Sequence, residues 1–252
     1  MRVIVSSVLA VLLASPVFAG GEQLQSEAMV LTDTVRGRDV AVQLYFPIGD
    51  HGCVESRSCP VAFLSPGYGL PHTSYSFLAE VLSARGYLSV AIQHDLPTDP
   101  PLTGKGNLVE VRTPAWQRGA ANLRFVKDEL SKIYPNYDWS ALALVGHSNG
   151  GDISAFLLGN TPHFAQQLVT LDHRRVPLPR DPSLQVLTIR GSDFEADPGV
   201  LLSETEKASS GTCIVEIAGS RHNDMHDAGP SQLKAQISAV LRRFLVDRGC
   251  GA

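Results

Sequence analysis

Short apolar runs recur along the chain at intervals that suit the strands of an α/β protein. One of them, residues 40–46, alternates apolar with polar positions like a half-buried strand, and several others are apolar throughout like buried strands. The strands predicted from these runs cover residues 40–46, 61–64, 87–93, 141–145, 167–171, 185–189 and 213–217.

Between these runs, apolar residues repeat with the spacing of helices. The pattern predicts helices over 77–82, 115–133, 153–158 and 233–245. Thr73 or Ser74 is expected to cap the first of them. Residues 95–114 are rich in proline and glycine, and we expect a long loop there that forms a rim or small lid. Strands that alternate with helices in this way predict an α/β fold with a mostly parallel central sheet and helices on both faces.

Composition and charge exclude several classes of partner. The chain has 252 residues, of which 44% are hydrophobic, and a formal net charge of −4. A chain of this length and composition is expected to form one domain with a large core. Because acidic and basic residues nearly balance, we expect neither nucleic acid nor an acidic membrane surface as a partner. The sequence suggests no nucleotide, flavin or required metal, and it leaves the oligomeric state open.

The first residues have the pattern of a secretory signal. Arg2 precedes the apolar residues 3–13, and small residues lead up to Ala19. The apolar stretch is too short to anchor the chain across a bilayer, so cleavage is expected after Ala19. We therefore expect a signal peptide over 1–19 and a single secreted or periplasmic domain over 20–252, without a membrane span.

The cysteines suit an oxidising compartment, and they are Cys53, Cys59, Cys213 and Cys250. Cys53 and Cys59 flank a short polar loop and form the natural local pair, which leaves Cys213 for Cys250. Four cysteines allow three pairings, and the sequence does not choose among them. Because no C-x-x-C spacing is present, a zinc site made by cysteines is disfavoured.

A serine with glycines on either side follows the strand predicted at 141–145. The segment Gly146-His147-Ser148-Asn149-Gly150 matches the pattern G-x-S-x-G, and a helical segment follows it. In a strained turn from strand to helix, glycines leave room for the backbone and the serine hydroxyl is exposed. Ser148 is therefore the candidate nucleophile. The backbone N–H of Asn149, at the start of the next helix, is a candidate donor to an oxyanion.

A serine hydroxyl needs a base to remove its proton, and in this fold the base follows the serine and the acid along the chain. His222 and His226 lie in the loop after the last predicted strand, where such a base belongs. His222 is nearer the strand and is the preferred candidate. A metal site built on these two histidines is disfavoured, because the loop is not evidently helical and lacks the glutamate of H-E-x-x-H.

Three aspartates compete for the role of the acid that orients the base. Asp172 ends the strand predicted at 167–171, whereas Asp193 and Asp197 follow the strand predicted at 185–189. Spacing does not choose among them, and short acids at strand ends also cap turns. Residues 173–175, His-Arg-Arg, are either a binding segment for a substrate carboxylate or phosphate or a solvated basic loop.

A glycine-rich turn, Ser65-Pro66-Gly67-Tyr68-Gly69-Leu70-Pro71, follows the strand predicted at 61–64. Such a turn aims a second backbone N–H at the same oxyanion, and that of Tyr68 is the candidate. The alternative is a simple turn without this role.

With these motifs the chain resembles the α/β-hydrolase superfamily, and within it the platelet-activating-factor acetylhydrolase and dienelactone-hydrolase-like branch. The likeness extends from about Val40 to the C-terminus, and the segments that carry it are Phe63–Gly69, Ser74–Tyr87, Gly146–Gly150, Leu171-Asp172 and Gly219–His222.

The resemblance implies the α/β-hydrolase fold. It favours Asp172 as the acid, because the acetylhydrolases have theirs in a Leu-Asp pair after the strand that follows the nucleophile helix. Many other hydrolases use the later strand, which keeps Asp193 and Asp197 in contention. One departure is Ser65-Pro66-Gly67 in place of the family's common His-Gly, which removes a side chain that often braces the loop.

Together the motifs predict an exported serine hydrolase that cleaves small-molecule carboxylic esters through an acyl-enzyme. The short interval between Asp172 and the next predicted strand leaves no room for a large cap domain, which favours short or accessible acyl groups. The alternatives are a peptidase or amidase with the same triad, and a hydrolase-fold binding protein that has lost its activity.

Overall fold

The computed structural model describes residues 24–49, 53 and 58–247. The strands of this part of the chain form one eight-stranded sheet in the order β1-β2-β4-β3-β5-β6-β7-β8. Strands β3 to β8 pair in parallel among themselves, and at one edge β2 pairs antiparallel with β4 and β1 pairs antiparallel with β2. In chain order the strands are β1 (Ser26–Asp33), β2 (Arg38–Tyr45), β3 (Cys59–Ser65), β4 (Leu88–Ile92), β5 (Tyr137–His147), β6 (Gln167–Leu171), β7 (Gln185–Arg190) and β8 (Cys213–Glu216).

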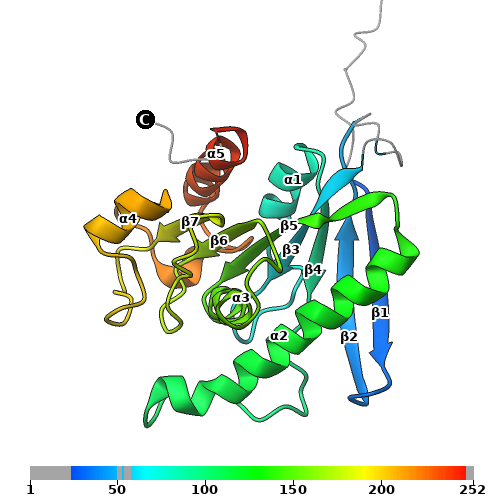
Figure 1. The fold of residues 1–252 in the computed structure, drawn as a ribbon, viewed down its shortest axis with the longest axis horizontal. Coiled ribbons are helices and arrows are strands. Elements are labelled where there is room, and N and C mark those ends of the chain that lie inside the picture. The colour runs from blue at the N-terminus through cyan, green and yellow to red at the C-terminus, as the bar shows by residue number, and fades with distance from the viewer. Residues whose placement is uncertain (1–23, 50–52, 54–57, 248–252) are drawn as a thin grey trace, which may run out of the picture.

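Helices cover both faces of this sheet (Figure 1). Helices α1 and α5 pack on one face, and α2 and α3 pack together on the other. The helices are α1 (Ser76–Ser83), α2 (Leu108–Ile133), α3 (Asn149–Asn160), α4 (Glu204–Ser210) and α5 (Ser231–Asp247), with a short 3₁₀ turn η1 (His222–Asp224). The predicted α/β class, the mostly parallel sheet and the helices on both faces are therefore confirmed.

Both faces of the central strands are buried, which explains why these strands are apolar throughout. Along β3, Val61 and Phe63 join the core under α2 and α3, while Ala62 and Leu64 join the core under α1 and α5. Successive side chains of a strand point to opposite faces, so a strand covered on both sides needs an apolar residue at every position.

The link between β6 and β7, residues 172–184, contains no helix. This link therefore holds no large cap domain, as the short interval between Asp172 and the next predicted strand led us to expect. The carboxyl ends of the neighbouring parallel strands β3, β5, β6 and β7 lie along the same edge of the sheet, so that edge is not covered by an inserted domain at this point.

The long loop predicted over 95–114 is shorter than expected, because α2 begins at Leu108 and includes Pro114. The side chain of Asn107 accepts hydrogen bonds from the N–H groups of Val109 and Glu110 and caps the helix before the proline. A proline in the second turn of a helix removes one backbone hydrogen bond, which this long helix tolerates.

The predicted cap of the first helix is wrong. Helix α1 begins at Ser76, and neither Thr73 nor Ser74 caps it. Instead the carboxylate of Asp227 accepts hydrogen bonds from the N–H groups of Ser76 and Phe77, at 2.8 and 3.2 Å. A carboxylate distant in the sequence thus satisfies the free N–H groups of the helix start.

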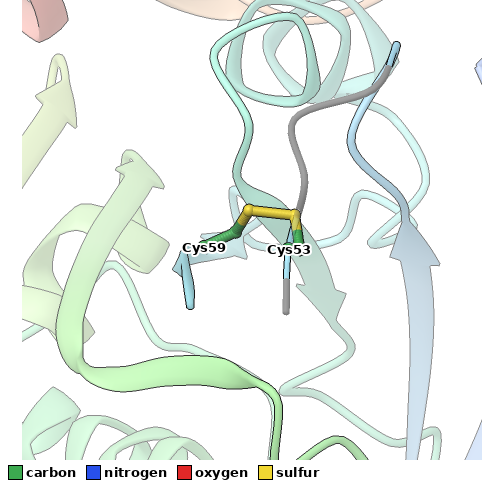
Figure 2. The surroundings of a disulfide bond; sticks show 2 residues. All are labelled: Cys53 and Cys59. Carbon is green, nitrogen blue, oxygen red and sulfur yellow. A yellow bond between two sulfur atoms is a disulfide. The ribbon is translucent and has the colours of Figure 1, made fainter. Parts of the chain in front are cut away.

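A disulfide joins Cys53 to Cys59, the local pair that the sequence favours (Figure 2). It ties the segment before β3 to the first residue of that strand. Cys250 lies outside the described residues, so its pairing with Cys213 stays a prediction, and so does the signal peptide over 1–19. Among the described helices, none combines the length and the apolar character that crossing a bilayer requires.

Candidate active site

Ser148 lies at the sharp turn between β5 and α3. Its φ of 50° falls in the left-handed region, which a non-glycine residue rarely occupies. Its backbone N–H donates to the carbonyl of Leu171 at 2.8 Å, which ties the turn to the end of β6. A side chain at Gly146 or Gly150 would collide with backbone, since Gly146 packs on Gly150 and Gly150 packs on the carbonyl of Ser65. The structure therefore explains the glycines of the motif.

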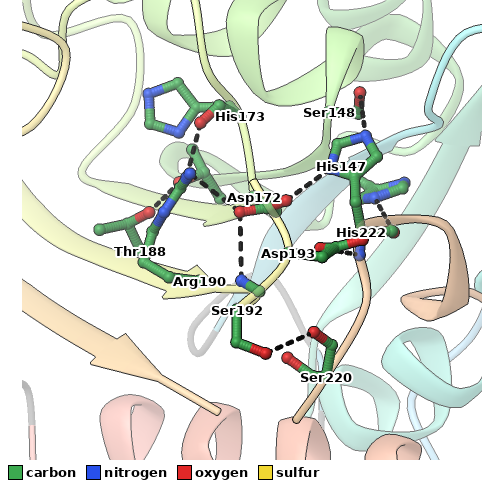
Figure 3. Close-up of polar contacts among 12 residues, drawn as sticks. His147, Ser148, Asp172, His173, Thr188, Arg190, Ser192, Asp193, Ser220 and His222 are labelled. Carbon is green, nitrogen blue, oxygen red and sulfur yellow. Dashed lines mark hydrogen bonds and ion pairs between the residues drawn. The ribbon is translucent and has the colours of Figure 1, made fainter. Parts of the chain in front are cut away.

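His222 connects Ser148 to Asp172 (Figure 3). Its Nε2 lies 2.9 Å from Oγ of Ser148, and its Nδ1 lies 2.5 Å from Oδ2 of Asp172. Ser148 lies at the turn between β5 and α3, His222 in η1 after β8, and Asp172 directly after β6. Of the residues that the sequence proposes for nucleophile, base and acid, these three lie in one hydrogen-bonded series.

The carboxylate of Asp172 is fully buried, and besides His222 two groups hold it. Oδ1 forms an ion pair with Nη2 of Arg190 at 2.8 Å and accepts the N–H of Gly191 at 3.1 Å. Burial alone raises the pKa of this carboxyl, but the hydrogen bond from His222, the charge of Arg190 and the Gly191 N–H together hold the pKa below its ordinary value. Asp172 is therefore poised as a carboxylate.

Arg190 is a residue of the site that sequence reasoning missed. It is buried at the end of β7, and its Nη1 donates to the carbonyl of His173 at 2.6 Å, so one guanidinium holds both Asp172 and the residue after it. The available signal was an arginine directly after the apolar strand predicted at 185–189, since a charge there requires a buried partner.

The other two candidate acids have different contacts. Asp193 accepts the backbone N–H of His222 at 2.7 Å, so it supports the histidine loop without contacting the imidazole nitrogens. Asp197 forms an ion pair with Arg175. In the described structure the carboxylate on the imidazole is that of Asp172.

The basic segment at 173–175 divides into separate roles. His173 is buried, and burial lowers its pKa to about 3, so it carries no charge near neutral pH. Arg175 is paired with Asp197. The guanidinium of Arg174 stacks on the ring of Phe194 at 4.3 Å, and that ring lies edge-on to His222 with centroids 5.8 Å apart. Only Arg174 of this segment therefore reaches the immediate surroundings of the imidazole.

The loop after β3 is braced by side chains other than the histidine common in the family. Oγ of Ser65 lies 2.9 Å from Nε2 of His94, and the N–H of Gly67 donates to Oη of Tyr75 at 3.0 Å. Both His94 and Tyr75 are buried. The departure in the sequence therefore leaves the loop supported.

The two candidate oxyanion donors, the backbone N–H groups of Asn149 and Tyr68, lie in segments that side-chain hydrogen bonds hold in place. Asn149 is the first residue of α3, where an N–H has no acceptor within the helix. Its side-chain Oδ1 accepts from Nε1 of Trp116 at 3.1 Å. The N–H of Tyr68 follows the braced Gly67, and Oη of Tyr68 accepts the N–H of Leu102, which ties the rim loop to this turn.

His226 takes no part in the series around Ser148. Its Nδ1 accepts the backbone N–H of Ala228 at 3.3 Å, and the adjacent Asp227 caps α1. The preference for His222 over His226 agrees with this geometry.

Neither a protein-family model nor a curated protein matches the chain. Solved structures do match. A ferulic acid esterase from Streptomyces cinnamoneus has a TM-score of 0.61 at 17% identity, over 94% of this chain and 92% of that one. A serine hydrolase without lid from Xanthomonas campestris has a TM-score of 0.59 at 18% identity, over 93% and 97%.

A dienelactone hydrolase from Anabaena variabilis has a TM-score of 0.58 at 17% identity and covers 89% of this chain and 98% of that one. These identities are too low to transfer a substrate, but the likeness spans nearly the whole of each chain. The chain therefore has the fold of the α/β-hydrolase superfamily, as its sequence resemblance implied.

Proposed function

We propose that this protein is an exported serine hydrolase that cleaves carboxylic esters through an acyl-enzyme. The observation that carries the proposal is the unbroken series from Ser148 through His222 to the buried carboxylate of Asp172, with contacts of 2.9 and 2.5 Å. The solved structures of the same fold include a ferulic acid esterase, which supports esters as the substrate class.

In the proposed reaction, Oγ of Ser148 attacks the ester carbonyl carbon while Nε2 of His222 takes its proton. Asp172 holds the imidazole in the tautomer with hydrogen on Nδ1 and stabilises the imidazolium that forms. The backbone N–H groups of Tyr68 and Asn149 bind the oxyanion of the tetrahedral intermediate.

Collapse of this intermediate breaks the bond to the alcohol, which leaves with the proton from His222 and deposits the acyl group on Ser148. Water then attacks the acyl-enzyme as His222 accepts its proton. The second tetrahedral intermediate expels Oγ of Ser148, which recovers its proton from His222, and releases the carboxylic acid.

The substrate of this proposal is a small-molecule ester with a short or accessible acyl group. The support is the link at 172–184, which carries no helix that would roof the serine. The N–H of Leu102, in the loop before α2, donates a hydrogen bond to Oη of Tyr68, in the turn after β3. This loop therefore contributes to the wall of the proposed site.

Export is part of the proposal and rests on the signal-like residues 1–19. The Cys53–Cys59 disulfide supports a secreted or periplasmic location, because disulfides persist mainly in oxidising compartments.

The experiment is hydrolysis of p-nitrophenyl esters from acetate to palmitate by the mature oxidised protein and by Ser148→Ala. We expect activity that peaks at short chains, and a loss of about 10⁵-fold or more in kcat on removing the nucleophile. A folded Ser148→Ala variant that keeps its activity would contradict the proposal.

The same assay addresses the alternatives. A peptidase or amidase would show higher kcat/KM on amides than on matched esters. A binding protein without activity would turn over neither class and would fail to react with a serine-directed fluorophosphonate.

A further inference from the structure

A series of buried hydrogen bonds joins the turn of Tyr68 to the loop of His222 without passing through Ser148. The N–H of Gly67 donates to Oη of Tyr75 at 3.0 Å, and the same oxygen lies 2.7 Å from Nδ1 of His147. Nε2 of His147 lies 3.0 Å from the backbone carbonyl of His222. Tyr75 and His147 are each 3% exposed.

The direction of every bond in this series is fixed by chemistry. The carbonyl of His222 can only accept, so Nε2 of His147 carries the hydrogen. Burial, together with the neighbouring His222, lowers the pKa of His147 to about 3, so the ring is neutral and its Nδ1 is an acceptor. The hydroxyl of Tyr75 must therefore donate to Nδ1, which leaves its lone pairs for the N–H of Gly67.

At one end, the series orients the peptide group of Tyr68. The carbonyl of Gly67 accepts the N–H of Leu70 at 3.1 Å, so both the N–H and the C=O of Gly67 have fixed partners. Because a trans peptide is planar, the N–H of Tyr68 must point away from that carbonyl. The packing is tight, since a Cβ on Gly67 would lie 2.8 Å from Nδ1 of His147.

At the other end, the series orients His222. Nε2 of His147 holds the carbonyl of His222, and the two imidazole rings pack with their centroids 4.9 Å apart. Both side chains are labelled in Figure 3. His147 directly precedes Ser148 at the turn between β5 and α3. Its side chain therefore links the turn that carries Ser148, the turn that carries Tyr68 and the loop that carries His222.

We propose that Tyr75 and His147 are positioning residues, which hold the N–H of Tyr68 and the imidazole of His222 in fixed positions on either side of Ser148. The inference rests on the proposed ester hydrolysis and adds to it a link between the oxyanion donor and the base. Neither side chain contacts the reacting atoms. Both act through the N–H of Tyr68 and the imidazole of His222.

Tyr75→Phe removes one oxygen and leaves Gly67 and His147 without their shared partner. We expect kcat on a short p-nitrophenyl ester to fall about 10- to 100-fold, with KM within about threefold, because an oxyanion donor acts mainly in the transition state. The affinity for an aryl trifluoromethyl ketone, whose bound hemiketal places an oxyanion in the same position, should fall by a similar factor.

Tyr45→Phe is the matched control. Tyr45 is a buried tyrosine of β2 in the same core layer as Tyr75 and lies outside the hydrogen-bond series. We expect its kcat and its inhibitor affinity to stay within about twofold of the wild type, since removing one hydroxyl elsewhere leaves the site unchanged.

A pair of variants at His147 tests the same link independently and decides the matter if Tyr75→Phe does not fold. The amide of Gln offers one donor and one acceptor, as the neutral imidazole does, whereas Leu offers neither. We expect His147→Gln to retain most of the kcat and His147→Leu to lose it together with inhibitor affinity.

The proposal is overturned if folded Tyr75→Phe keeps both kcat and inhibitor affinity within about twofold of wild type, or if His147→Gln and His147→Leu lose activity equally. In those cases the wild type still hydrolyses esters, so the proposed function stands. A folded wild type that neither turns over esters nor reacts with a fluorophosphonate would overturn both proposals together.

Discussion

Asp172 differs from its two competitors in what its carboxylate contacts. It meets the imidazole of His222 with one oxygen and Arg190 with the other, in a fully buried position. Asp197 instead pairs with Arg175, and Asp193 binds a backbone N–H. A carboxylate that orients a histidine must contact a ring nitrogen, and only Asp172 of the three does so in the described structure.

The variants Asp172→Asn and Asp197→Asn separate these roles. Asp172→Asn removes the charge that favours the imidazolium, and we expect kcat to fall about 10³- to 10⁴-fold. Asp197→Asn should stay within about threefold of wild type, because it loses only a partly exposed ion pair. Steady-state kinetics on one ester, with circular dichroism to confirm folding, measure both. The opposite ranking would assign the acid to Asp197.

The sequence alone proposed Ser148 as nucleophile and His222 as base but left the acid open, for a physical reason. The glycines around the serine and the position after the last strand are local signals. The choice of acid depends on which side chain the imidazole meets after folding. The buried partners, Arg190, Tyr75 and His147, were missed as site residues because their role depends on contacts between distant segments.

At the scale of elements, periodicity located most of the strands and helices, and the errors lie at their ends and edges. Strand β1 is an edge strand in which only Leu31 and Asp33 are buried, and because one of these two is charged, the apolar alternation is too short to predict a strand. Helix α4 is short and lacks an apolar stripe, although its capping box of Ser203 and Glu206 is visible in the sequence. The start of α1 depends on Asp227, which no local pattern indicates.

Asp152 in the first turn of α3 fixes the segment that follows Asp172. Its Oδ1 accepts the N–H groups of Arg175 and Val176 at 2.9 and 3.0 Å. Burial raises the pKa of this carboxyl to about 6, against an ordinary value of 3.8, although the backbone N–H groups oppose the shift. A carboxyl with a raised pKa contributes stability at low pH and loses that contribution as the pH rises through the folded-state value.

Asp152→Asn keeps an oxygen acceptor for both N–H groups and cannot ionise. The free energy of unfolding of this variant, relative to wild type, should therefore increase between pH 4 and pH 7, by up to about 3 kcal/mol. Urea unfolding at several pH values measures the difference. A difference that does not change with pH would show that Asp152 ionises in the fold as freely as in the unfolded chain.

At the scale of the whole molecule, the parallel sheet brings distant residues to one edge. The oxyanion turn follows β3, Ser148 follows β5, Asp172 follows β6, and His222 follows β8. Because neighbouring parallel strands end at the same edge, the crossover topology alone places these four segments together. The four segments come together although they are far apart in the sequence, because the strand order of the sheet sets where each strand ends.

Reaction of the folded protein with a fluorophosphonate, followed by mass spectrometry of its peptides, shows directly whether Ser148 is an activated nucleophile. We predict one adduct per chain, located on Ser148, with a rate that falls about 10³-fold or more in His222→Ala because the base is lost. The absence of an adduct, or an adduct on another serine, would show that Ser148 is not the nucleophile, and an unchanged rate in His222→Ala would show that His222 is not its base.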